Sequence, residues 1–204
     1  LAESGKIYPS DSIFVADYRA TRAYEQEGQG EVIVFDQRAA EFKGFSGLRY
    51  YEPDGAFVVP ARLTRPPTPE QETLPTSIER TKTFYIIGTL DFELNGQKLQ
   101  LRCYSWDPKS KEATVFFKDS TAGAETLPAG RYLEVSFDDN DATTLDFNRA
   151  YNPYCAYTDT YNCPLPPKSN QLSVAIPAGE KIYPRVAGAQ AHAEPAAEPT
   201  PSAP

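Results

Sequence analysis

The sequence predicts a mainly β fold, either an antiparallel β-sandwich or a barrel-like single domain. Two observations favour this class. The chain has 19 prolines and a 12% share of aromatic residues, a composition that suits strands and extended loops better than long helices. Short apolar runs recur between turn-forming residues, and no alternation of strands with long helices is visible. A chain of 204 residues is also long enough to bury a substantial core without cross-links.

The N-terminal part is expected to carry a short helix. Across 12–27, apolar residues return at three- and four-residue spacings behind capping candidates, and Gly28 provides a stop. This pattern predicts an amphipathic helix. The apolar run at 31–35 predicts a buried strand, and 36–42 suits two further helical turns. We assign residues 1–11 to an N-terminal extension.

A strand, a turn and a second strand are expected next. Residues 49–51 and 56–64 are predicted to be strands on either side of a turn at 53–55. The following stretch, 65–75, holds four prolines in eleven residues. Because helices and central strands do not tolerate that density, we predict a surface loop or linker there.

Residues 84–105 carry the strongest local signal, which is that of a β-hairpin. Asn95 and Gly96 form the dipeptide that a two-residue type I′ turn prefers. With this loop, apolar residues face one another on one side of the hairpin and polar residues do so on the other, as a half-buried antiparallel pair requires. The predicted facing pairs are Phe92 with Leu99, Leu90 with Leu101, Gly88 with Cys103, Glu93 with Lys98, and Asp91 with Gln100.

Further strands and a tail complete the predicted organisation. Strand-like runs separated by turn-forming residues occur at 114–117, 132–137 and 143–147. From Ala187 the composition narrows to mainly Ala, Pro and Glu, which has almost nothing to bury. We therefore predict a Pro/Ala-rich tail of the disordered type over 185–204, and a β-rich domain over 12–184.

Charge and hydropathy exclude several classes of function. Lys and Arg number 20 against 28 Asp and Glu, which gives a formal net charge of −8. Nucleic-acid binding needs a basic footprint, so no nucleic-acid partner is expected. No stretch approaches the roughly 18 consecutive apolar residues that a membrane-spanning helix needs.

The chain offers few residues for common catalytic or metal chemistry. Its single histidine, His192, lies in the Pro/Ala-rich tail, where nothing would hold an imidazole in place for catalysis. Zinc prefers four Cys or His ligands, and three cysteines without a CxxC pair do not supply them. The acidic run 138–141 lacks the glycine and glutamate of a calcium loop and is better explained as a turn. No catalytic residue, metal or cofactor is predicted.

Two of the three cysteines are candidates for a disulfide. Cys155 and Cys163 enclose seven residues rich in turn formers, so a bond closing a small loop is reasonable in an oxidising compartment. Two reduced structural thiols are the alternative. Cys103 falls on the apolar face of the predicted hairpin and is expected to be an inert small hydrophobe.

Several stretches of the chain together resemble one protein family. They are FKGFSGLRYYEPDGAFVVPARL (42–63), FKDSTAGAETLPAGRYL (117–133), LDFNRAYNPYCAY (145–157) and CPLPPKSNQLSVAIPAGEK (163–181). In these stretches the chain resembles the DUF1684 family of bacterial and archaeal proteins, over roughly residues 12–184. The motif residues that the resemblance carries over are Asp119, Arg131, Asp146, Asn148, Arg149, Asn152, Cys155, Cys163, Asn170 and Glu180. The resemblance implies a fold unit and no particular activity.

The chain departs from the family pattern at one turn. The family usually has a Tyr-Gly-Gly-like stretch before Gly-Arg-Tyr, whereas Leu127, Pro128 and Ala129 precede Gly130 here. Glycine permits the backbone to approach a ligand closely, and leucine and proline do not. A ligand pocket at that turn would be lost or reshaped in this chain.

The polar motif residues support two interpretations. Asn148, Asn152 and Asn170 suit turns and caps, and Arg149 suits bracing of carbonyls or pairing with Asp146, which favours a structural role. The same side chains could instead line a polar pocket. The candidate binding residues under that second interpretation are Asp119, Arg131, Asp146, Asn148, Arg149 and Asn152.

These observations lead to a first expectation about function. We expect a non-enzymatic accessory or extrinsic subunit that docks on a larger membrane-associated or multi-subunit assembly, for example a respiratory or photosynthetic complex. Its partners would be protein subunits, and both the N-terminal extension and the tail would lie against them. The alternative is a small-molecule-binding or hydrolase-like protein that uses the polar pocket.

The expected location is extracytoplasmic, in the periplasm or on the outer face of a membrane, with the cytoplasm as the alternative. The sequence begins with Leu1 and contains no Met, and a removed secretory signal is one ordinary cause of such a beginning. A disulfide between Cys155 and Cys163 would fit the same compartment.

Overall fold

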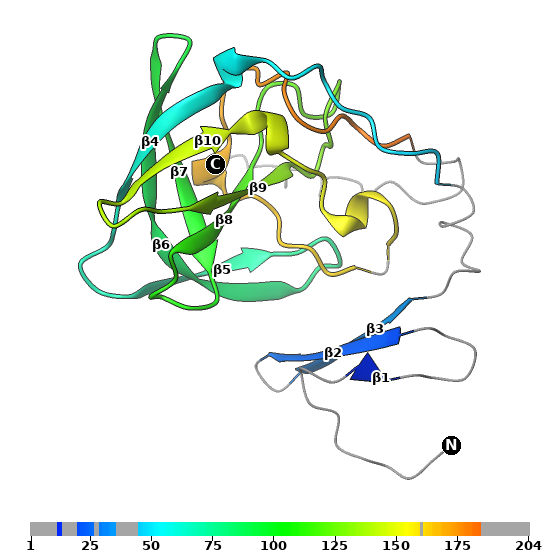
Figure 1. The fold of residues 1–204 in the computed structure, drawn as a ribbon. Coiled ribbons are helices and arrows are strands. Elements are labelled where there is room, and N and C mark those ends of the chain that lie inside the picture. The colour runs from blue at the N-terminus through cyan, green and yellow to red at the C-terminus, as the bar shows by residue number, and fades with distance from the viewer. Residues whose placement is uncertain (1–11, 14–19, 27–28, 36–44, 160, 185–204) are drawn as a thin grey trace, which may run out of the picture. The chain divides into compact units, whose positions relative to one another are not determined.

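The computed structural model describes residues 12–13, 20–26, 29–35, 45–159 and 161–184 (Figure 1). The chain divides into two units, 1–46 and 47–204. Each unit is described by itself below.

The N-terminal unit contains a small antiparallel sheet. Its strands are β1 (Ser12–Ile13), β2 (Ala20–Gln26) and β3 (Gln29–Phe35), in the order β1-β2-β3. The strand expected at 31–35 is confirmed within β3, whereas the helix expected over 12–27 is wrong wherever the structure describes it. The run EVIVF is a strong strand former, and pairing with it outweighs the weak helical spacing of the preceding segment. Residues 14–19 of the expected helix, and the expected turns at 36–42, lie outside the described residues.

The larger unit is built on one antiparallel sheet that curls into a nearly closed barrel (Figure 1). Its strands are β4 (Val58–Thr64), β5 (Glu70–Pro75), β6 (Thr81–Leu94), β7 (Gln97–Ser105), β8 (Glu112–Phe117), β9 (Arg131–Ser136) and β10 (Ala142–Asp146). They follow the order β10-β4-β6-β7-β8-β9, and β5 pairs with the first half of β6. Four short 3-10 turns lie at Gly55–Phe57, Phe147–Arg149, Tyr154–Ala156 and Lys168–Asn170. The mainly β, barrel-like fold is therefore confirmed.

The hairpin of β6 and β7 has the predicted register. All five predicted facing pairs are formed. Asn95 and Gly96 have φ angles of 53° and 75°, as a type I′ turn requires. The register shifts by one residue between Ile86 and Gly88, where a Cβ on Gly88 would lie 2.5 Å from the Thr64 carbonyl oxygen. The bulge and its glycine let β4 approach β6 closely.

The predicted proline-rich loop at 65–75 is wrong in its second half. Its first three prolines, Pro66, Pro67 and Pro69, precede β5, and Pro75 is the last residue of that strand. β5 pairs with β6 alone among the named strands. A strand at such an edge tolerates a proline at its end, because the missing N–H is not needed for a second ladder.

Two hydrophobic clusters lie on opposite faces of the sheet. The barrel interior is filled by alternating side chains, of which Leu90, Leu101, Val115 and Leu145 are fully buried. Phe116 alternates with these inward residues and therefore belongs to a second cluster outside the barrel. This outer cluster comprises Leu74, Phe84, Tyr104, Phe116, Tyr132, Cys155 and Cys163.

Candidate functional site

Asp119 and Arg131 form a buried ion pair at one end of the barrel. Arg131 is the first residue of β9, and Asp119 follows β8 closely. The Arg131 Nη2 atom donates to Asp119 Oδ2 at 2.7 Å, and each side chain is 1% exposed. The guanidinium carbon lies 5.3 Å from the centre of the Phe117 ring. The sequence named both residues as candidates, and the structure brings them together.

Arg131 and Asp119 also form hydrogen bonds with residues 176–182, which cross one end of the barrel. Arg131 also donates to the carbonyl oxygens of Ile176 at 3.0 Å, of Ala178, and of Glu180 at 3.4 Å. Asp119 Oδ1 accepts from the Ile176 N–H at 3.3 Å and from Thr121, whose N–H and hydroxyl lie at 2.8 and 2.5 Å. We call residues 176–182 the closing segment. Beyond their contact with each other, the two side chains direct their hydrogen bonds to this segment and to Thr121, and the Arg131 Nε atom has no partner among the described residues.

Asn152 and Glu180 make a second buried polar contact on the closing segment. The Glu180 carboxylate is 2% exposed and accepts from the Asn152 backbone N–H at 2.8 Å and from the Tyr157 hydroxyl. The Asn152 amide donates to the Lys181 carbonyl at 2.8 Å. The pKa of Tyr157 is raised. The largest cause is burial of the phenol, and the second is its hydrogen bond to Glu180. A neutral tyrosine is thereby kept as the donor to a buried carboxylate.

Asp146 and Asn148 brace a distant turn. The Asn148 side chain accepts from the Asp54 N–H and donates to the Asp54 carbonyl, both at 2.9 Å. Asp146 Oδ1 accepts from the Asn148 backbone and side-chain N–H groups at 3.1 and 3.0 Å. Arg149 is exposed and takes part in none of these contacts. The candidate residues therefore separate into a buried ion pair, an amide that binds the closing segment, a pair that braces a turn, and an exposed cation.

The Asn170 side chain connects β7 and β8 next to the point where the two strands pair. β7 and β8 pair at Tyr104 and Thr114, and beyond that point the Asn170 amide spans the gap. Its Oδ1 accepts from the Arg102 N–H at 2.8 Å, and its Nδ2 donates to the carbonyls of Arg102 and Phe116, each at 2.8 Å. The side chain is fully buried with its hydrogen bonds satisfied, which is a structural role.

The turn at 127–130 is an ordinary β-turn. The Gly130 N–H donates to the Leu127 carbonyl at 2.9 Å, and Pro128 occupies the second position, where its fixed φ is favourable. Gly130 has a φ of 93°, and a Cβ there would lie 2.5 Å from Pro166 Cγ. The Pro166 ring thus packs directly on this turn.

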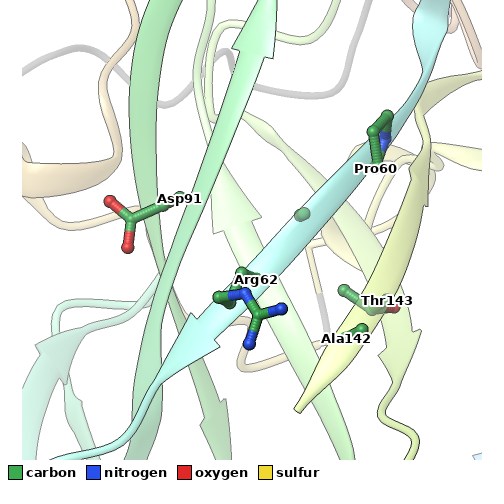
Figure 2. A pocket seen from close by; sticks show the side chains of 6 residues that line it. Pro60, Arg62, Asp91, Ala142 and Thr143 are labelled. Atoms are coloured by element: carbon green, nitrogen blue, oxygen red, sulfur yellow. The ribbon is translucent and has the colours of Figure 1, made fainter. Parts of the chain in front are cut away.

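A surface depression lies elsewhere on the barrel (Figure 2). Its lining residues are Pro60, Ala61, Arg62, Asp91, Ala142 and Thr143. Figure 2 shows Arg62 on β4. Asp91 lies on β6 to one side of β4, and Thr143 lies on β10 to the other side. None of the candidate residues lines it.

The described residues contain no group of three His, Cys, Asp or Glu side chains that could hold a metal ion. Within the same part of the chain, no helix is long and apolar enough to cross a membrane.

Cys155 and Cys163, the candidates for a disulfide, lie close together. The Cys155 backbone N–H donates to the Cys163 sulfur at 3.4 Å, and both residues are buried. The covalent bond remains a prediction. Cys103 is fully buried inside the barrel, and burial raises the pKa of its thiol to about 12, which fits an inert side chain.

Among the described residues, the two most exposed aromatic side chains were not singled out from the sequence. Trp106 is 56% exposed and Tyr154 is 67% exposed. Trp106 packs on Phe84 with ring centres 4.0 Å apart, and Tyr154 packs on Tyr161 at 4.9 Å. The available signal was the position of the single tryptophan in the turn sequence SWDPKS, where burial is not expected.

One comparison with known proteins identifies a family, and no comparison gives an activity. The model of the family described as "Protein of unknown function (DUF1684)" matches residues 43–181. A solution NMR structure of an uncharacterized protein from Haloarcula marismortui is similar to this chain, with 42% sequence identity and a TM-score of 0.57. That match covers 68% of this chain and 78% of the other. A search of curated proteins finds no match.

Proposed function

The chain belongs to the DUF1684 family, and from this premise we propose that it is a non-enzymatic accessory subunit that docks on a larger membrane-associated or multi-subunit assembly. The observation that carries the proposal is the use made of the polar motif residues. Asp119, Arg131, Asn152 and Asn170 direct their hydrogen bonds to the chain's own backbone and side chains. Such residues stabilise a scaffold and leave recognition to its surface.

Trp106 and Tyr154 are the side chains best suited to recognition. Both rings are more than half exposed, and each is supported by a second ring beneath it. Tryptophan and tyrosine are enriched among residues that dominate binding energy at protein interfaces. Because the supporting rings restrict the rotamers in advance, little conformational entropy is lost on docking.

The charge of the chain favours a protein partner. A net charge of −8 opposes binding to the phosphates of nucleic acids and of anionic lipid headgroups. A neutral or basic protein surface would be attracted to the chain, and its apolar pockets would receive the two aromatic rings.

The proposal is tested by recovering the assembly from the native source. Tagged wild-type chain, the double variant Trp106→Ala/Tyr154→Ala and the control Val58→Ala are purified under mild conditions, and the co-purifying chains are identified by mass spectrometry. Val58 is a matched control because it is 41% exposed and apolar but lies on β4. We expect defined partner subunits with the wild type and the control, and their loss with the double variant. Recovery of wild-type chain without stoichiometric partners would refute the proposal.

The tail supplies a second arm of that experiment. Residues 187–204 have too little apolar content to stabilise the domain, so their deletion should leave its melting temperature unchanged. If the tail lies against a partner, the same deletion weakens retention in the assembly. Unchanged retention would remove the tail from the proposed interface.

A small-molecule-binding or hydrolase-like function is the second candidate, and one observation favours it. The Oδ1 atom of Asn152 is buried without a partner among the described residues, beside the Tyr157–Glu180 contact. An unpaired buried acceptor is a place where a ligand donor, or a water molecule, gains a hydrogen bond. A ligand that raises the melting temperature of wild type but not of Asn152→Ala, or a turnover lost in the exposed-residue variant Arg149→Ala, would establish this function instead.

A further inference from the structure

We propose that Cys155 and Cys163 form a thiol–disulfide site, which is oxidised by exchange with a low-molecular-weight disulfide such as oxidised glutathione. The two residues share the outer cluster, with exposures of 5% and 7%. The Cys163 sulfur lies 3.4 Å from the Cys155 backbone nitrogen, which places it within reach of the Cys155 side chain. This inference is independent of the proposed function.

The backbone around both cysteines is held in place by contacts that do not involve the sulfur atoms. On one side, Asn152 is bound to Glu180 and Lys181 of the closing segment. On the other side, the Cys163 N–H donates to Ser77 Oγ at 3.1 Å, and the Ser77 N–H donates to the Cys163 carbonyl at 2.9 Å. The thiols therefore meet at a high effective concentration, which favours an intramolecular bond over a mixed disulfide with glutathione.

Cys103 does not compete for this bond. It belongs to the cluster inside the barrel, is fully buried, and donates to the Gly88 carbonyl at 3.5 Å. The sheet separates it from the outer cluster. The pairing is thus determined by the fold, although the chain has three thiols.

The chemistry balances as two successive exchanges. The thiolate of one cysteine attacks a sulfur of oxidised glutathione, and one glutathione thiolate leaves with its electron pair. The thiolate of the other cysteine then attacks the protein sulfur of the mixed disulfide and expels a second glutathione thiolate. Two protein S–H bonds are lost, one S–S bond is formed, and two molecules of reduced glutathione carry away the hydrogens. Because both thiols are nearly buried, the first attack requires local opening of the segment that carries Tyr154 and Tyr161.

The bond would tighten the part of the chain that presents Tyr154. It would close the loop 155–163 and restrict the unfolded chain, so the oxidised domain should melt at a higher temperature than the reduced one. Tyr154 directly precedes the linked residue and would be held more firmly on Tyr161.

Peptide mass mapping of the wild-type chain provides the decisive test. Cleavage after Arg149 and Lys168 yields a single peptide, 150–168, that contains both Cys155 and Cys163, whereas Cys103 falls in the peptide 103–109. Reduced full-length chain is equilibrated in glutathione redox buffers, alkylated under denaturing conditions and digested. We expect peptide 150–168 to lose two hydrogens and resist alkylation in oxidising buffer, with peptide 103–109 alkylated throughout. Full alkylation of 150–168, a persistent glutathione adduct on it, or a link to 103–109 would each overturn the proposal.

A stability measurement adds a second readout with matched variants. Wild type and Cys103→Ala should melt several degrees higher after oxidation than after reduction, and Cys155→Ser should show no such difference. An equal redox-dependent shift in Cys155→Ser would contradict the pairing. Should Cys155→Ser fail to fold, the mass mapping of the wild type still decides the question.

Discussion

Arg131 and Asp119 meet at 2.7 Å with only 1% of each side chain exposed, at the point where the closing segment crosses the barrel end. The other ion pairs described for this chain are far more exposed, including the pair of Lys111 with Asp139, whose side chains are 68% and 88% exposed. A buried pair is costly to desolvate and is recovered only through good geometry and further hydrogen bonds. Here those hydrogen bonds go to the closing segment, so the pair couples the barrel to the C-terminal part of the domain.

Replacing one partner of this pair should therefore destabilise the domain strongly. In Asp119→Asn the shape of the side chain is retained, but the Arg131 charge is left buried without a counter-ion. We expect the free energy of unfolding to fall by about 3–5 kcal/mol, measured by urea denaturation. The control Asp139→Asn makes the same chemical change in the exposed pair and should cause no measurable loss. Similar effects of the two substitutions would show that the buried pair has no special role.

Asn170 allows a similarly controlled test of the link between β7 and β8. Asp is nearly the same size as Asn, yet an ionised carboxylate cannot donate to the carbonyls of Arg102 and Phe116. Asn170→Asp should therefore cost at least about 2 kcal/mol of unfolding free energy, since two buried carbonyls lose their donors. Asn95→Asp, in the exposed hairpin turn, should cost less than about 1 kcal/mol. Equal costs would mean that solvent replaces the lost hydrogen bonds at Asn170.

Stability should decline in alkaline solution. The pKa of Tyr51 is raised from the ordinary 10.0 to about 12. The largest cause is burial, and the second is the hydrogen bond to Glu125. Burial is also the largest cause of raised pKa values at Tyr104, Tyr132, Tyr151 and Tyr157. Above pH 10 the unfolded chain loses these protons while the folded chain keeps them, so the unfolded state binds fewer protons and stability falls as pH rises.

Urea unfolding at a series of pH values checks this expectation. The free energy of unfolding should be insensitive to tyrosine ionisation below pH 10 and should fall between pH 10 and about 12. Tyr51→Phe removes one of the contributing phenols, and its decline should be shallower than that of the wild type. An unchanged slope in this variant would exclude Tyr51 from the effect.

The local part of the fold was predictable because its cause lies in neighbouring residues. The register of β6 and β7 follows from one dipeptide, Asn95 and Gly96, together with strict alternation on both strands. β2 and β5 were mispredicted because pairing with β3 and β6 decides their conformation. Tertiary pairing overrides weak local preference in such segments.

The candidate site was predictable in its residue types and not in its contacts. Asp119 and Arg131 were named together, but their shared role on the closing segment depends on residues 45 or more positions away, as the contact between Arg131 and Ile176 shows. The partner of Asn148 is Asp54, 94 positions earlier. No spacing rule links residues so far apart, so the sequence could not separate bracing from ligand binding. Once the contacts are known, bracing accounts for most of the polar motif.

Gly130 offers the last prediction, and it concerns the β-turn at 127–130. A side chain at this position meets two obstacles, a φ of 93° and a Cβ that would lie 2.7 Å from the Phe117 carbonyl oxygen. The oxygen is part of β8 and cannot move without disturbing the sheet. Gly130→Ala should therefore reduce the free energy of unfolding by about 2–4 kcal/mol.

Gly123 separates the two contributions, because its φ is 88° but nothing lies within 4 Å of an added Cβ. Gly123→Ala should cost only the conformational part, about 1 kcal/mol. Gly130 directly precedes Arg131, so displacement of the turn in Gly130→Ala should also loosen the closing segment. Faster amide exchange at Ile176 and Ala178 in Gly130→Ala, with unchanged exchange in Gly123→Ala, is the expected result. Equal destabilisation by both substitutions would show that the close contact with β8 and Pro166 contributes nothing.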